Sequence, residues 1–142
     1  MYKAVVIRLF PTKSQAKLLW QNIGIARWTW NWGLATQRKM YFEYKKILSI
    51  CELKRKITEI RNDEGFKWLQ RVSRQVEANA LIDLGKAYKN FFRILKNGNN
   101  GGLPKFKSKG KCTPSFCTRS EMCSGNFTER LNDNFAKCEN GN

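Results

Sequence analysis

The sequence contains no histidine, and none of its five cysteines is spaced as a CxxC pair. The absence of histidine excludes imidazole as a general base, and structural zinc sites usually use close pairs of Cys and His. We therefore expect no metal and no cofactor. No stretch approaches the roughly 20 apolar residues of a membrane span, and the first apolar run is too short for a signal peptide. These absences predict a cytoplasmic protein with reduced cysteines.

Acidic residues are also scarce. The 142 residues include 27 Lys and Arg but only 11 Asp and Glu, which gives a formal net charge of +16. Such an excess disfavours folding through self-repulsion and favours a polyanionic partner. Because no strongly apolar amphipathic segment accompanies the charge, we expect nucleic acid rather than a membrane or a small-molecule substrate. The few carboxylates form no arrangement typical of catalysis.

Three Ser or Thr residues mark the starts of three expected helices. Thr12 and Ser49 are each followed three positions later by Gln or Glu, the capping-box pattern, and Ser73 precedes a third periodic segment. Apolar residues recur at intervals of three and four after each of them, which indicates amphipathic helices with a buried face. Residues 12–97 are therefore predicted to form a compact helical lobe, similar to a helix-turn-helix.

Three tryptophans fall within five positions on the first expected helix. Each helical residue turns about 100°, so Trp30 lies nearly opposite Trp28 and Trp32. Trp30 continues an apolar stripe and is predicted to lie in the core. Trp28 and Trp32 make the helix apolar on a second face as well. That face could be covered within this domain, by a nucleic-acid base or by a further domain.

Two segments are expected to pair as strands. The β-branched run YKAVVIRLF predicts a first strand within residues 1–11, and the Gly-rich and basic residues 98–111 supply a candidate return strand. On an extended strand the lysines of PKFKSKGK project to one side as a cationic edge for phosphates, while Phe106 anchors in the core. A flexible basic linker is the alternative. The predicted fold is mainly α with a small β component, the helices being inserted between the two strands.

Arg27 and Asn31 stand one helical turn apart between the two apolar faces. This pair could form a surface bridge, position a phosphate or hold a buried backbone segment. A single cation elsewhere is ordinarily solvated, but the sum of the cations favours phosphate contacts. The candidate nucleic-acid-binding residues are Arg27, Asn31, Arg38, Lys39, Lys54, Arg55, Arg74, Lys105, Lys107 and Lys109.

Four features occur in one order over residues 2–109: the opening YKAVVIRLFPTKSQAKLLW, the spacing G-x-x-R-x-x-x-N-x-x-L from Gly24 to Leu34, the run WLQRVSRQVEANALIDLGKAYKNFF, and GLPKFKSK. In these features the chain resembles the N-terminal part of the TnpB family, also called OrfB, accessory transposase-like proteins of bacterial insertion sequences. The resemblance implies a helical recognition lobe inserted into a wedge-type β-barrel. It also implies RNA-guided DNA cleavage, in which this part grips guide RNA and target DNA while base pairing reads the sequence.

The resemblance also implies parts that the sequence lacks. The family's RuvC-like nuclease, with three metal-binding carboxylates, and its CxxC…CxxC zinc ribbon would follow residues 2–109. Residues 112–142 match only loosely and have neither helical nor strand periodicity, so we expect a disordered or frameshifted tail. The resulting hypothesis is a truncated, non-catalytic nucleic-acid-binding fragment. Two alternatives stay open: a standalone sequence-specific DNA-binding regulator, and a decayed reading frame whose product has no activity.

Overall fold

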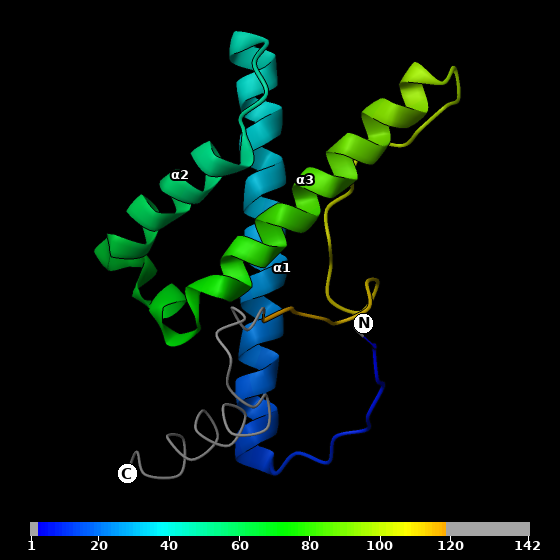
Figure 1. The fold of residues 1–142 in the computed structure, drawn as a ribbon. Helices are drawn as coiled ribbons and strands as arrows, with labels where there is room; N and C mark the ends of the chain where they lie inside the picture. Colours follow the sequence, from blue (N-terminus) through cyan, green and yellow to red (C-terminus); the bar gives the residue numbers. More distant parts are fainter. Residues whose placement is uncertain (1–2, 119–142) are drawn as a thin grey trace. The chain divides into compact units, whose positions relative to one another are not determined.

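The computed structural model of the chain describes residues 3–118, and these fall into two units, residues 3–20 and residues 21–118. Four helical elements follow in chain order: α1 (Lys13–Tyr44), α2 (Ile50–Asn62), the 3₁₀ helix η1 (Glu64–Arg71) and α3 (Arg74–Lys96) (Figure 1). None of these described helices combines the length and the apolar character needed to cross a membrane.

The predicted strands are wrong. Residues 3–118 contain no strand, so the described chain holds no sheet and no part of a β-barrel, and its regular structure is helical. The β-branched run is exposed, and the side chain of Val6 is 99% accessible to solvent. High β propensity does not by itself create a strand, because a strand is stabilised only by a paired neighbour and a buried face. Of the expected tail, residues 113–118 have no regular structure, and residues 119–142 lie outside the described part.

The predicted helix starts are confirmed. The backbone N–H of Thr12 donates to Oε1 of Gln15 (3.0 Å), and that of Ser49 donates to Oε2 of Glu52 (2.7 Å). In return, the Ser49 hydroxyl accepts from the backbone N–H of Glu52, which completes the capping box of α2. The Ser49 backbone hydrogen bond, aided by the hydroxyl, lowers the pKa of Glu52. Ser73 caps α3 with its hydroxyl alone, which accepts from the backbone N–H of Gln75 (3.3 Å).

Trp28, Trp30 and Trp32 pack against other helices within residues 21–118, on two faces of α1, and Trp28 and Trp32 are half-buried there. Trp30 is buried against α3, as predicted. Trp28 and Trp32 stack on each other with centroids 6.3 Å apart, and Trp68 of η1 meets Trp28 edge-on at 5.0 Å. The domain itself therefore covers this second face in part, which is the first of the three alternatives given above. The buried apolar residues of the three clusters are Ile25, Ala26, Leu69, Val72 and Val76; Leu48, Leu53, Ile57 and Leu81; and Trp30, Leu34 and Leu84.

Buried polar side chains fix two connections between the helices. The guanidinium of Arg61 donates to the carboxylate of Glu77 (2.6 Å) and to the carbonyl of Val72 (2.8 Å), which ties α2 to the start of α3. Burial raises the pKa of Glu77, although Arg61 acts in the opposite direction. The side-chain amide of Gln37 donates to the carbonyl of Leu48 (2.7 Å) and accepts from its N–H (2.8 Å). This second pair holds the loop before α2 against α1.

Gly33 allows α3 to cross α1 closely. A Cβ at this position would lie 2.9 Å from Cδ2 of both Leu81 and Leu84, closer than real Cβ contacts. Gly24, one of the residues of the G-x-x-R motif, has no atom within 4 Å of such a Cβ. A side chain at position 33 would therefore displace Leu81 and Leu84, whereas one at position 24 would meet open space.

Candidate nucleic-acid interface

The chain reverses direction after α3 and returns toward α1. Gly98 has φ +74°, a left-handed conformation that glycine adopts readily, and its N–H donates to the carbonyl of Leu95 (3.0 Å). Gly101 then lies against Ile94, whose side chain is 3.0 Å from where a Cβ would be. We call residues 103–111 the return segment; Figure 1 shows it running from the end of α3 back to α1. It is irregular up to residue 108 and forms a turn at residues 109–111.

Three side chains of α1 hold the backbone of the return segment. The amide of Asn31 donates to the carbonyl of Lys107 (2.8 Å) and accepts from its N–H (2.7 Å). The indole N–H of Trp30 donates to the carbonyl of Lys105 (3.0 Å), and the guanidinium of Arg38 donates to the carbonyl of Pro104 (3.2 Å). Of the roles considered for Asn31, the structure therefore shows the one that holds a backbone segment. These four bonds fix residues 104–107 without any β-ladder.

Cation–aromatic contacts accompany these hydrogen bonds. Nζ of Lys107 lies 4.1 Å from the centroid of the Trp30 ring, and Cζ of Arg38 lies 4.8 Å from that of Phe106. The prediction that Phe106 anchors in the core is wrong, since its side chain is 50% exposed. It rested on strand alternation, which an irregular segment does not follow. Burial raises the pKa of Tyr88 on α3, while nearby Arg38 acts in the opposite direction.

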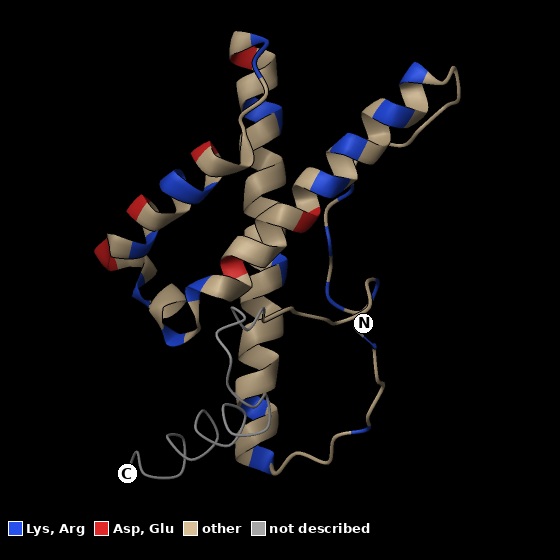
Figure 2. Cartoon of the chain, viewed as in Figure 1, with Lys and Arg blue, Asp and Glu red and all other residues tan. Residues whose placement is uncertain are grey.

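Positive charge is concentrated on the C-terminal half of α3 and on the return segment. From Leu84 to Lys111 the sequence has eight Lys and Arg and no Asp or Glu. Figure 2 shows only basic colouring along these two stretches, whereas acidic residues appear on α2 and on the first half of α3. We call these two basic stretches together the basic face; their cations are Lys86, Lys89, Arg93, Lys96, Lys105, Lys107, Lys109 and Lys111.

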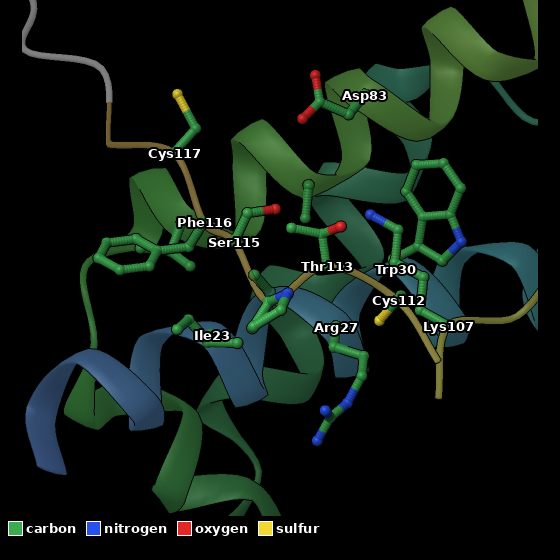
Figure 3. Close-up of a pocket in the computed structure, with 14 residues that line it drawn as sticks. Ile23, Arg27, Trp30, Asp83, Lys107, Cys112, Thr113, Ser115, Phe116 and Cys117 are labelled. Carbon is green, nitrogen blue, oxygen red and sulfur yellow. The ribbon is translucent and has the colours of Figure 1, made fainter. Parts of the chain in front are cut away.

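Arg27 lines a pocket of about 230 Å³ next to the basic face. Figure 3 shows it on α1, with Lys107 on one side and the hydroxyls of Thr113 and Ser115 above it, on a segment that crosses from the return segment. The amide of Asn79 on α3 donates to the carbonyl of Cys117 (2.9 Å) and so holds that segment in place. The pocket thus contains a cation and hydroxyl groups, but also the carboxylate of Asp83.

The structure brings together about half of the predicted site residues. Arg27, Asn31, Arg38, Lys105 and Lys107 meet where α1 holds the return segment, and Lys109 lies exposed in the turn that follows. The others lie elsewhere. Lys54 and Arg55 are on α2, which Figure 2 shows on the opposite side of α1 from the return segment. Lys39 is exposed on α1, and Arg74 begins α3 close to Glu77. A nucleic-acid contact for any of these residues stays a prediction.

Sequence reasoning missed the contribution of Trp30 and Pro104 to this site. The helical stripe predicts a core position for Trp30, but it carries no sign that the indole N–H also reaches the return segment. Pro104 is buried, and its carbonyl accepts from Arg38. The one available signal was that indole N–H groups usually find an acceptor when they are buried.

Known proteins resemble this chain in sequence. Residues 1–46 match the family model of a helix-turn-helix domain of OrfB/IS605 type. Two relatives are "Putative RNA-guided DNA endonuclease InsQ" of Escherichia coli strain K12, 28% identical over 109 residues, and "Putative RNA-guided DNA endonuclease" of Streptomyces pristinaespiralis, 26% identical over 113 residues. The alignments cover 77% and 80% of this chain, but 26% and 27% of the relatives. The resemblance to the N-terminal part of the TnpB/OrfB family is confirmed.

The residues that match the family model, 1–46, include the whole of α1. Within residues 3–46 the structure has one continuous helix, α1, and no turn interrupts it between Lys13 and Tyr44. The chain spans about a quarter of the length of the curated relatives it matches.

Proposed function

We propose that this chain binds nucleic acid through the basic face, with Arg27 and Arg38 of α1 at its border. The observation that carries the proposal is the anchoring of the return segment: four hydrogen bonds with the side chains of Trp30, Asn31 and Arg38 hold residues 104–107. Lysines on a held backbone meet phosphates at a smaller entropic cost than lysines on a free linker. Among the described cations of the basic face, Lys86 alone pairs with a carboxylate, that of Asp83 (3.5 Å), so the positive charge of the others is uncompensated.

The names of the relatives suggest which nucleic acids are bound. Both are described as RNA-guided DNA endonucleases, which handle a guide RNA and a DNA target. We infer that the basic face contacts the backbone of such a guide RNA or of the target DNA, and that it does so through phosphates. Phosphate contacts position a protein on a nucleic acid without reading the bases. The cytoplasmic location expected from the sequence stays a prediction.

The salt dependence of binding tests the proposal. On duplex DNA each neutralised phosphate contributes about −0.9 to the slope of log K against log salt concentration, and about −0.7 on a single strand. We expect fluorescence anisotropy with a labelled 20-mer to give a steep negative slope. The double variant Lys105→Gln/Lys109→Gln should make the slope shallower by about 1.8 on duplex.

A matched control removes the same charge elsewhere. Lys46 and Lys67 each already face a carboxylate, of Glu52 at 3.4 Å and of Glu64 at 3.9 Å. Lys46→Gln/Lys67→Gln should therefore leave the slope almost unchanged. An affinity that does not vary with salt would contradict the proposed function, and an equal effect of the two double variants would contradict its placement on the basic face.

We further propose that these 142 residues bind DNA without cutting it. Four described carboxylates already lie within 4 Å of a cation: Glu52, Glu64, Glu77 and Asp83. The chain, incubated with supercoiled plasmid and Mg²⁺ under conditions where binding is measured, should leave the plasmid intact. Nicked or linear product that requires the protein would refute this part of the proposal.

One observation favours a second candidate, a sequence-specific DNA-binding protein: the matched family model is described as a helix-turn-helix domain. Such proteins place a recognition helix in the major groove and prefer their site over random DNA by about 10³-fold or more. Selection from a random duplex library, followed by competition with scrambled duplex, separates the candidates. If scrambled duplex displaces the protein at the same concentration as the selected duplex does, sequence-specific binding is rejected.

A further inference from the structure

We propose that Phe106 is a stacking platform for an unpaired base, so that the basic face takes single-stranded nucleic acid in preference to duplex. This inference rests on the proposed function and adds to it the form of nucleic acid bound. Three features of the structure carry it: the exposure of the ring, its support from behind by Arg38, and the charge on either side of it.

The ring of Phe106 is exposed on a backbone that is fixed on both sides. Its side chain is 50% accessible, while its neighbours along the chain are held: Lys105 through its carbonyl by Trp30, and Lys107 through both backbone groups by Asn31. An exposed phenylalanine on a free loop would lose entropy on stacking. A ring on an anchored backbone loses less, so this arrangement favours binding.

Arg38 supports one face of the ring. Its guanidinium lies 4.8 Å from the ring centroid, and the same group donates to the carbonyl of Pro104, which fixes its position. A planar cation that covers one face leaves the other face for a second planar group. A base on that face would complete a stack of base, ring and guanidinium, a combination of stacking and cation–π contact used in single-strand binding.

The charges beside the ring fit a nucleotide chain and not an apolar peptide. Lys105 and Lys109 are exposed on either side of Phe106 along the return segment. A single strand carries a phosphate on either side of each stacked base, so one strand can use both kinds of contact. A duplex cannot, because its bases already stack on each other and their faces are closed; it can use the lysines alone.

The test measures single-strand and duplex affinity on the same variants of the full chain. The probes are a labelled 12-mer of oligo(dT), the same length of oligo(U), and a blunt 20-base-pair DNA duplex. Phe106→Leu keeps an apolar side chain but removes the flat ring, and Phe106→Trp keeps a ring. Stacking contributes about 1–3 kcal/mol per base, so Phe106→Leu should weaken single-strand binding roughly 5- to 150-fold. Duplex binding should change less than twofold, and Phe106→Trp should retain single-strand affinity.

Phe42→Ala removes a phenylalanine that is 74% exposed, outside the basic face, and should alter neither affinity. A Phe106→Leu chain that binds the single strands as tightly as the parent overturns this inference while the salt-dependent binding proposed above stands. An equal loss of affinity for single strand and duplex also overturns it, because the ring would then support the structure of the basic face and not stack on a base. Binding of neither probe by the parent chain overturns the proposed function and this inference together. The oligo(dT) and oligo(U) arms show whether DNA or RNA supplies the base.

Discussion

The Asn31 side chain is the strongest single anchor of the return segment, and its removal has a calculable effect. Asn31→Ala deletes the two hydrogen bonds to Lys107, at 2.8 and 2.7 Å. Each partly buried hydrogen bond contributes a net ~1 kcal/mol, so the loss is about 2 kcal/mol. Since 1.4 kcal/mol corresponds to a factor of ten, the segment should detach from α1 about 30 times more often.

Hydrogen exchange of the Lys107 amide measures this detachment directly. The amide donates to Asn31, so its exchange should accelerate about 30-fold in Asn31→Ala, the conversion of about 2 kcal/mol. Gln37→Ala is a matched control, because the Gln37 amide makes the same pair of bonds, at 2.7 and 2.8 Å, to the backbone of Leu48. That variant should accelerate exchange at Leu48 and leave the local opening at Lys107 unchanged.

Two results would refute the reasoning. Equal exchange of the Lys107 amide in the parent and in Asn31→Ala would mean that Trp30 and Arg38 hold the segment without help. Equal acceleration at Lys107 in both variants would mean that the amide opens only by global unfolding, and that the segment has no separate anchor.

Three further predictions concern stability. Gly33→Ala should lower the free energy of unfolding by about 1–3 kcal/mol, because its Cβ would overlap Leu81 and Leu84. Gly24→Ala, where a Cβ meets open space, should raise it by up to about 1 kcal/mol through helix propensity. Urea unfolding measures both variants, and equal effects would contradict the close crossing of α1 and α3 at Gly33. Glu77→Ala should lower the free energy of unfolding by about 3–5 kcal/mol, because Arg61 is left buried and unpaired. A change of less than about 1 kcal/mol in urea unfolding would contradict this prediction. For Glu52, the folded pKa lies below the ordinary 4.5, so its stabilising contribution is present above pH 4.5 and is lost as the pH falls through the folded value. The difference in melting temperature between the parent and Glu52→Gln should therefore be largest near pH 7 and shrink toward pH 3; a difference independent of pH would point to another cause.

The helices were predictable because their signals are local. Thr12, Ser49 and Ser73 cap helices through side chains that reach only two or three residues along the chain, and the apolar stripes follow from the helical repeat. The strands were mispredicted because a strand depends on a partner that no local pattern specifies. The position of Phe106 failed with them, since its expected burial assumed the alternation of a paired strand.

The site was predictable in part. Asn31 stood out as a polar residue between two apolar faces, and holding a backbone segment was among the roles considered for it. Gln37 lies on the Trp30–Leu34 stripe, where a polar residue signals a buried partner, but nothing in the sequence names Leu48 as that partner. Contacts such as those of Arg38 with Pro104 and Phe106 join positions 66 residues or more apart and depend on how the helices cross. The excess of cations in the sequence indicates a polyanionic partner. Which of these cations lie near one another depends on the fold and could not be predicted.

The attachment of the return segment to α1 also requires that the distance between Asn31 and Arg38 along the helix match the distance between Lys107 and Pro104 along the segment. A helix advances 1.5 Å per residue and an extended chain about 3.3 Å, so the seven steps from Asn31 to Arg38 cover about the same 10 Å as the three steps from Lys107 back to Pro104. An insertion of one residue between Asn31 and Arg38 would rotate the guanidinium by about 100° away from its carbonyl while leaving the amide in register. Natural variation in this stretch of α1 should accordingly exchange side chains far more readily than it adds or deletes residues.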